Sequence, residues 1–285
     1  MKVFFVYSAS YSDLLREADV RILINFATIG VRGERKIPVG FKDVIIDSGG
    51  YQLQVGTSLG IYSPNRLVEQ DVRDLSYIGT RQIWKKKPDV NLYAMWLSME
   101  LPKHPEVSGF FNLDILGDGI ESMENQFKLE KLGVRPIPIW HLGEGEEYLE
   151  YYCRNYDYIG VGGLIAGSTS KGSLKKLVTL LNQKYKGPKY HFLGIGITGA
   201  SVFMEARPYS VDFSTWSNPA RFGSHIVTDP KQILKEVGLP KEIRDRMRTD
   251  KGLTYKYLRE AIALIKDMET SIEAVHTDTV QELML

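Results

Sequence analysis

The sequence predicts an α/β protein built as a (β/α)8 TIM barrel, followed by extra C-terminal helices. Three observations predict this class. Short apolar, β-rich runs recur along the 285-residue chain, and a helix-like stretch follows most of them, which favours parallel βαβ units. There are eight such runs in a chain close to the roughly 250 residues typical of a barrel, which favours a barrel over a doubly wound sheet. We place the barrel at 1–228 and a helical extension packed on it at 229–285.

The predicted elements follow in chain order. The first run, MKVFFVYSASYSD, has one Lys and is interrupted by Ser and Tyr, so it reads as a strand rather than a signal peptide. The eight predicted strands are 3–8, 43–47, 92–97, 110–115, 136–140, 158–161, 190–195 and 209–213. Helices between several of them are predicted at 120–132, 144–154, 171–184 and 198–206. After Asp229 and Pro230 the pattern becomes helical, with helices at 230–237, 241–250 and 253–268 and an acidic final stretch that frays or packs at an edge.

Composition excludes several classes of protein. Lys and Arg total 36 against 35 for Asp and Glu, a net charge of +1, which excludes a globally basic nucleic-acid coat and an acidic disordered chain. Cys153 is the one cysteine, so the chain builds neither a disulfide framework nor a multi-thiolate zinc site. No apolar run reaches the roughly 18 residues that span a bilayer. We therefore expect a reduced, cytoplasmic protein with no membrane contact.

Polar residues gather where the predicted strands end, and barrel enzymes build their sites at those ends. Two carboxylates on opposite sides of a pocket suit reactions at a sugar anomeric carbon, one as nucleophile and the other in proton transfer. Glycine pairs let the main chain approach a planar ligand closely, and Asp or His side chains can read a base edge. Taken singly, each Asp that follows a strand could instead be the N-cap residue of the next helix. The strand-end segments are 47–52, 112–114, 140–143, 160–164, 193–196 and 211–216.

Three of these segments resemble motifs of the tRNA-guanine transglycosylases. DSGGYQ at 47–52 resembles the family's DSGGFQ, GGLIAG at 162–167 resembles GGLAVG, and LGIG at 193–196 resembles LMGVG. The motifs occur in the family's order, and the resemblance spans roughly 40–225. It implies a (β/α)8 barrel that exchanges guanine in a nucleic acid for a 7-deazaguanine base, such as the 7-cyano form preQ0. The backbone stays intact, and neither a metal nor a redox cofactor is needed.

The resemblance also implies site residues. Asp47 takes the place of the aspartate that contacts the incoming base and acts as general acid and base. Asp114 matches the aspartate that reads the guanine edge, and His141 stands where the family usually has Gln. Tyr51, where the family usually has Phe, would stack on the base. The base-binding set is Ser48, Gly49, Tyr51, Asp114, His141, Gly162, Gly163, Leu164 and Gly194.

The nucleophile follows from spacing within the resemblance. The family's aspartate lies about nineteen residues beyond the first Gly of LMGVG, and Asp212 lies eighteen beyond Gly194. An alignment without that offset puts Thr215, a much weaker nucleophile, at the position. We assign Asp212, with Arg221 as a phosphate or ribose contact.

Two differences from the sequences of the tRNA-guanine transglycosylases bear on which nucleic acid is the substrate. The tRNA enzymes carry a zinc subdomain with three Cys and one His, which this chain cannot form with one cysteine. In addition, VDFSTW at 211–216 followed by ARFG at 220–223 is similar to the DNA-guanine transglycosylases of 7-deazaguanine DNA modification systems, which are found in bacteria and their viruses. This resemblance implies the cytoplasm of a bacterium or a phage-infected cell. We therefore expect DNA as the polymer, with tRNA as the alternative. Partner proteins of such a system and a homodimer both stay open.

A basic segment lies near the C-terminus. Residues 241–259 hold seven basic against three acidic residues, which indicates either a phosphate-binding face or a solvated helix surface. Arg244 and Arg248 are its predicted backbone contacts.

Two rival functions compete with base exchange. GIGITGA at 194–200 follows an apolar strand, as a dinucleotide fingerprint does, but such a motif normally opens a fold that has several βαβ units after it. The other rival is a non-catalytic accessory subunit, against which the presence of both Asp47 and Asp212 argues.

Overall fold

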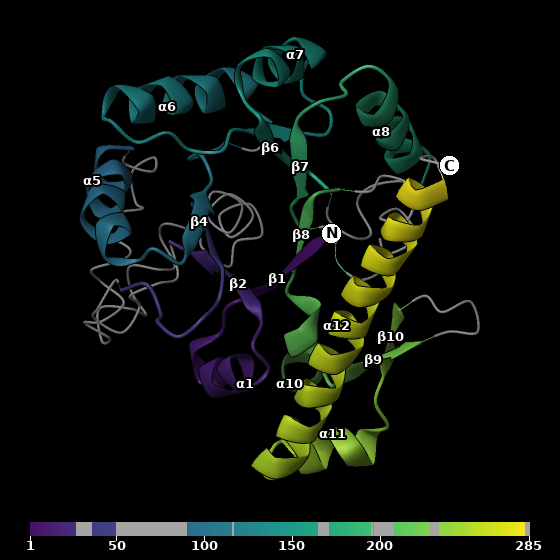
Figure 1. Ribbon diagram of the computed structural model, residues 1–285. Coiled ribbons are helices and arrows are strands. Elements are labelled where there is room, and N and C mark those ends of the chain that lie inside the picture. Colours follow the sequence, from purple (N-terminus) through teal and green to yellow (C-terminus); the bar gives the residue numbers. More distant parts are fainter. Residues whose placement is uncertain are drawn as a thin grey trace. The chain divides into compact units, whose positions relative to one another are not determined.

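A computed structural model describes residues 1–26, 36–49, 90–115, 117–164, 171–194, 196, 208–228 and 234–282 (Figure 1). The chain divides into two compact units. We call residues 22–163 the middle unit, and residues 1–21 together with 164–285 the terminal unit. The predicted division at residue 228 rests on the sequence pattern alone and stays a prediction.

The middle unit holds five parallel strands. β2 (Arg21–Asn25), β3 (Val44–Asp47) and β4 (Val107–Phe110) pair in the order β4-β3-β2, and β5 (Ile139–His141) pairs with β6 (Tyr158–Gly162). A parallel bridge between Phe111 and Ile137 joins the chain after β4 to the chain before β5. The helices of this unit are α5 (Val90–Glu100), η2 (Leu101–Lys103), α6 (Gly119–Lys131) and α7 (Glu146–Asn155).

The terminal unit holds three more parallel strands, in the order β1-β8-β7, and an antiparallel pair. The parallel strands are β1 (Lys2–Val6), β8 (Ser210–Phe213) and β7 (Lys189–Phe192). The antiparallel pair is β9 (Ser224–Thr228) with β10 (Leu234–Gly238). The helices are η1 (Ala9–Tyr11), α1 (Ser12–Glu17), α8 (Lys171–Gln183), η4 (Thr215–Ser217), α10 (Asn218–Phe222), α11 (Lys241–Met247) and α12 (Lys251–Glu282).

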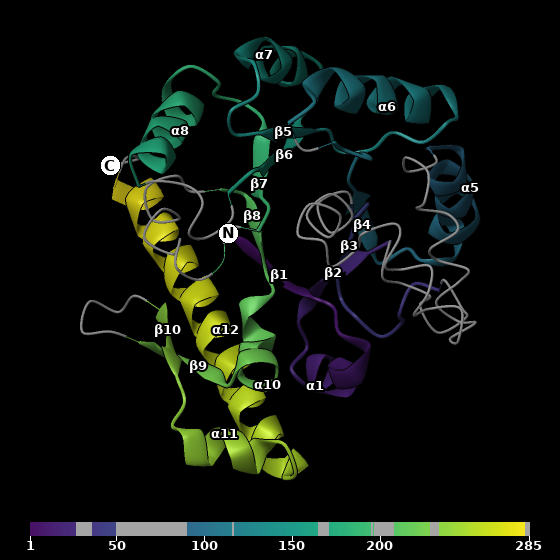
Figure 2. The same cartoon turned by 180° about the vertical axis from the view of Figure 1, so that it is seen from behind.

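The long helix α12 organises the C-terminal part of the terminal unit. It packs against β9, β10, α10 and α11, and Figures 1 and 2 show these elements along its length. Glu269 on α12 accepts hydrogen bonds from the backbone N–H of Val3 (2.9 Å) and from Arg21 (2.6 Å). These bonds tie the helix to β1. α12 continues past Glu269 to Glu282, so the chain does not fray from Glu269 onward.

The strands are apolar on both faces at their centres. Side chains on alternate faces of a strand are buried together: Ile22, Leu23 and Ile24 of β2 and Val44, Ile45 and Ile46 of β3 are each at most 3% exposed, as expected for parallel strands covered by helices. Eight parallel strands with helices between them make this an α/β chain, and the arrangement is compatible with a (β/α)8 barrel. Within the described ranges, no helix has the length and apolar character needed to cross a membrane.

The structure corrects the predicted strand at 92–97, which lies inside α5. Burial on this segment follows a helical spacing: Tyr93, Trp96, Leu97 and Glu100 are buried and lie three or four residues apart. The Phe26 ring packs against the rings of Tyr93 and Trp96, with a centroid distance of 4.9 Å in each case. The apolar, aromatic composition indicated a strand, but the packing face has a helical period.

Two further differences concern short segments. Strand β2 was not predicted, although its Ile-Leu-Ile run is typical of a buried strand. The helix predicted at 230–237 is wrong over its described part, because residues 234–238 form β10 and pair with β9, itself not predicted. The other predicted strands and helices that lie in described residues overlap observed elements. The largest end differences are at β4, which spans 107–110 against a predicted 110–115, and at α12, which ends at 282 against a predicted 268. Helices α1 and α10 were not predicted. The helix predicted at 198–206 lies outside the described residues.

Candidate functional site

The carboxyl ends of the middle-unit strands carry the predicted polar residues. Asp47 ends β3 and Ser48 follows it, His141 ends β5, and Gly162 ends β6. The chain beyond β4 carries Asp114, and α6 holds this segment in place: Asn125 Nδ2 donates to Leu113 O, and Ser122 Oγ accepts from Ile115 N, both at 2.9 Å. Parallel pairing therefore brings residues far apart in the sequence to one edge.

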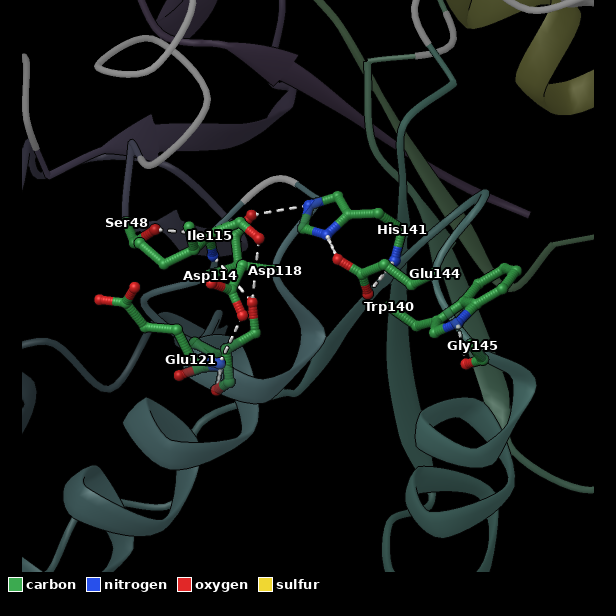
Figure 3. Close-up of polar contacts among 11 residues, drawn as sticks. Ser48, Asp114, Ile115, Asp118, Glu121, Trp140, His141, Glu144 and Gly145 are labelled. Carbon is green, nitrogen blue, oxygen red and sulfur yellow. Dashed lines mark hydrogen bonds and ion pairs between the residues drawn. The ribbon is translucent and has the colours of Figure 1, made fainter.

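Asp114, His141 and Glu144 form a buried hydrogen-bonded cluster, which we call the carboxylate–histidine cluster (Figure 3). His141 Nε2 lies 2.9 Å from Asp114 Oδ2, and Nδ1 lies 2.8 Å from Glu144 Oε1. Each of the three side chains is only 5–7% exposed. Ser48 Oγ, fully buried, donates to the second oxygen of Asp114 at 3.2 Å.

Burial by itself lowers the pKa of His141, but hydrogen bonds to Asp114 and Glu144 and the charges of these groups outweigh it and raise the pKa to about 9. The ring is then an imidazolium at neutral pH, and both nitrogens donate. The cluster holds two carboxylates and one cation. Because a carboxylate offers about four lone-pair sites, Asp114 can accept further N–H donors while it is held by His141 and Ser48.

Glu144 reaches His141 because the chain turns back directly after β5. Gly143 has φ +107°, a conformation that favours glycine, and Glu144 N donates to His141 O at 3.0 Å. Glu144 Oε2 in turn accepts from His141 N at 3.0 Å. The prediction placed Glu144 at the start of a helix, but α7 begins only at Glu146.

The predicted glycine turn lies against the histidine. His141 pairs with Gly162 in the β5–β6 register, and a Cβ atom at Gly162 would lie 2.5 Å from His141 Cδ2. No side chain fits there without displacing the ring. Gly163 has φ +74°, so the next residue also needs glycine.

Asp47 is held by the neighbouring strand. Asn25 Nδ2 donates to Asp47 Oδ2 at 2.8 Å, and the two residues face each other in the β2–β3 register. Tyr93 lies near both aspartates: burial, followed by the charges of Asp47 and then Asp114, holds its pKa well above the usual value. The neutral phenol donates to Phe111 O at 2.9 Å.

Asp212 lies at the carboxyl end of β8 in the terminal unit. Its Oδ1 accepts from Gly194 N at 3.0 Å and lies 3.4 Å from His191 Nε2. His191 is fully buried, and its Nδ1 lies 2.7 Å from Ser210 Oγ. Among the described residues, no hydrogen bond reaches Asp212 Oδ2, so this oxygen keeps its lone pairs for another partner.

Thr215, the alternative at the nucleophile position, has a different environment. Its Oγ1 is buried and has no hydrogen-bond partner within the described part of the chain. Among the described residues, no base therefore lies within hydrogen-bond distance to activate the hydroxyl. Trp216 is fully buried, and its Nε1 donates to Val6 O at 3.0 Å, so it fixes the segment after β8.

The remaining predicted site residues are distributed as follows. Gly49 has φ +86° and Gly194 has φ +67°. Leu164 is buried in the terminal unit. Tyr51 lies outside the described residues. The three predicted backbone contacts, Arg221, Arg244 and Arg248, are exposed and line one hollow of the terminal unit.

Sequence reasoning missed Glu144, His191 and Asn25. Each acts on a predicted residue through a turn or a neighbouring strand, and none belongs to a motif of the resemblance. The signal for Glu144 was the His-Leu-Gly-Glu turn, in which glycine permits the chain to fold back. No known protein-family model matches the chain, and comparison with curated proteins gave no match either.

Proposed function

We propose that the chain is a base-exchange transglycosylase that replaces guanine in DNA with a 7-deazaguanine base such as 7-cyano-7-deazaguanine. The observation that carries the proposal is the carboxylate–histidine cluster. The resemblance assigns base reading to Ser48, Asp114, His141 and Gly162, which come from four separate strand ends. In the middle unit these residues contact one another directly.

The chemistry of the cluster suits the edge of guanine. Guanine presents N1–H and N2–H donors side by side, and a carboxylate can accept both. A 7-deazaguanine has the same edge, because the change from N7 to carbon lies on the other ring. Asp114 therefore serves both the leaving and the incoming base, while His141 and Ser48 fix its orientation.

The environment of Asp212 supports its assignment as the nucleophile. In the first half of the reaction, Asp212 Oδ2 forms a bond to C1′ as the C1′–N9 bond breaks and its electron pair leaves with guanine. Oδ1 stays held by the Gly194 N–H. The target nucleotide must be turned out of the stack before attack, at a cost of a few kcal/mol.

Asp47 is proposed to move the proton. Its acid form protonates the departing guanine, and the resulting carboxylate takes the N9 proton of the incoming base. N9 then forms a bond to C1′ while the Asp212–C1′ bond breaks. Both aspartates return to their starting states, so the cycle consumes no co-reactant.

The experiment is guanine exchange. Radiolabelled guanine is incubated with the purified chain and either duplex DNA or bulk tRNA. We expect label in DNA alone, in keeping with a chain that has one cysteine and cannot form a three-cysteine zinc site. Label in tRNA alone would replace DNA by tRNA in the proposal. No label in either polymer, after addition of 7-cyano-7-deazaguanine and candidate partner proteins, would favour an accessory subunit.

A further inference from the structure

A basic hollow lies in the terminal unit, lined by α10, α11 and the start of α12. Its volume is about 800 Å³, within the range of sites that hold small molecules or parts of larger ligands. Arg221 and Phe222 come from α10, Arg244 comes from α11, and Arg248 follows α11 directly. We call it the α10–α11 groove.

The groove is strongly positive in a protein of net charge +1. Five basic side chains and one acidic side chain line it. The acid, Asp245, pairs with Arg248 at 3.3 Å. Arg221, Lys241, Arg244 and Lys251 make no ion pair with any residue that the structure describes. Unpaired cations around one concave surface attract a polyanion.

Gly223 lets the Arg244 side chain of α11 lie against the end of α10. It ends α10 in the left-handed conformation, with φ +64°, and a Cβ atom there would lie 2.4 Å from Arg244 Cδ. The Arg244 stem therefore lies directly across the end of α10. The Leu239 N–H donates to Gly223 O at 2.8 Å, which fixes the chain that leads into α11.

Aromatic rings lie among these cations. The Phe222 side chain is 63% exposed, and it is the sole phenylalanine or tryptophan among the exposed large apolar residues of the described chain. The Arg221 guanidinium lies 4.8 Å from its ring centroid. Tyr255 and Tyr11 also line the groove. Lys251 Nζ lies 5.5 Å from the Tyr255 ring centroid, and the rings of Tyr255 and Tyr11 pack edge-on with centroids 6.0 Å apart.

We propose that the α10–α11 groove binds a single-stranded segment of nucleic acid, with phosphates at Arg244 and Arg248 and an unpaired base stacked on Phe222. Cations alone would suit the backbone of a duplex equally well. An exposed ring among them adds binding free energy only where a base has left its pair, as in single-strand binding proteins. The inference deepens the proposed function, because base exchange requires the target nucleotide to leave the duplex.

The test measures binding by fluorescence anisotropy. The probes are a labelled oligothymidine of about 15 nucleotides and a hairpin duplex with the same number of phosphates. Phe222→Ala should weaken oligothymidine binding by about 5- to 100-fold and leave duplex binding within about 2-fold. Phe222→Trp, which keeps a stacking ring, should bind as the unaltered chain does.

Charge is tested separately. Arg244→Gln with Arg248→Gln should weaken oligothymidine binding and lower the slope of log affinity against log salt by about 0.7 per arginine. The matched control is Lys128→Gln with Lys131→Gln, two exposed cations of α6, which should leave the slope unchanged. Circular dichroism and thermal unfolding of each variant confirm the fold, since the altered side chains are exposed.

Three results would overturn the inference: full oligothymidine binding in Phe222→Ala, an equal loss on duplex and single strand in that variant, or an unchanged salt slope in the double arginine variant. Guanine exchange by the unaltered chain separates this inference from the proposed function. If the unaltered chain exchanges guanine but the groove variants bind oligothymidine normally, the groove inference is rejected and the proposed function stands. If single-strand binding depends on the groove residues but the unaltered chain exchanges no guanine, the transglycosylase proposal is rejected and the groove inference stands.

Discussion

The two units hold their candidate residues in opposite ways. In the middle unit, the side chains of Asp114, His141 and Glu144 hydrogen-bond one another, and both ring nitrogens of the histidine are engaged. In the terminal unit, Asp212 is held through Oδ1 by a backbone N–H, and within the described residues its Oδ2 receives no hydrogen bond. The first arrangement fixes three side chains mutually, and the second fixes one carboxylate and leaves one of its atoms open.

The difference corresponds to two kinds of work. A group that recognises a ligand gains from being oriented beforehand, because its rotamer entropy is lost before the ligand arrives. A group that forms a covalent bond needs an atom with a free lone pair. Under the proposed function, the mutually held side chains of the middle unit suit base recognition, and Asp212 in the terminal unit suits the role of nucleophile.

The largest expected effect comes from a change at Asp212, whose Oδ2 atom is the proposed nucleophile. Asp212→Asn should lower guanine exchange by roughly ten-thousand-fold or more and abolish the covalent glycosyl-enzyme detected by mass spectrometry, because an amide cannot displace the base. Thr215→Ala is the matched variant at the alternative position and should keep both. Activity in Asp212→Asn, or its loss in Thr215→Ala, would move the nucleophile.

The next effect concerns proton transfer. Asp47→Ala should lower exchange by about 100- to 10,000-fold, the usual contribution of a general acid and base. Asp43→Ala, which removes the carboxylate just before β3 begins, is the comparison variant and should retain exchange. Rates are measured with saturating base, so that weakened binding is separated from slowed chemistry. A normal rate for Asp47→Ala removes that residue from the mechanism.

A smaller effect tests how tightly the cluster is packed. Gly162→Ala places a methyl group 2.5 Å from His141 Cδ2, so the ring must move and the unfolding free energy should fall by about 1–3 kcal/mol. Base affinity should fall as well, since the His141–Asp114 bond is displaced. Chemical denaturation and calorimetric titration with 7-cyano-7-deazaguanine measure the two effects. An unchanged affinity would separate His141 from base recognition.

The last expected effect is a loss of stability at alkaline pH. The pKa of His141 is raised from about 6.5 to about 9 on folding, so its contribution to stability is fully present below pH 6.5 and is lost as pH rises through 9. The loss is on the order of 3 kcal/mol. Glu144→Gln should shift the titration to lower pH, and His141→Gln should remove it. Histidine NMR and urea unfolding across this range test both, and a His141 midpoint near 6.5 in the unaltered chain contradicts the imidazolium.

Much of the fold was predictable because strand and helix patterns in this chain are local. The ends of β3, β5 and β6 lie close to their predicted positions, so Asp47, His141 and Gly162 could be placed at strand ends from sequence alone. The pairing of Glu144 with His141 depends on one turn, and the partnership of His191 with Asp212 depends on which strands are neighbours. Those contacts are tertiary, and a single sequence does not specify them.

The misassigned segments have a similar cause. Residues 92–97 are apolar and aromatic enough for a strand, and only the spacing of the side chains buried against Phe26 identifies the helix. Strand β10 is short and amphipathic, and its pairing with β9 decides its conformation. Tertiary contacts override local preference at both places.

The pairing of β1 with β8 has a consequence for how the chain is made. The middle unit is one continuous stretch and has all its residues once position 163 has been synthesised. By contrast, β1 waits for Ser210–Phe213 before it can pair with β8, and Glu269 must follow before the Val3 N–H finds its acceptor. Because domains fold as their residues emerge, the first strand gains its β8 partner and its Glu269 hydrogen bond only late in synthesis.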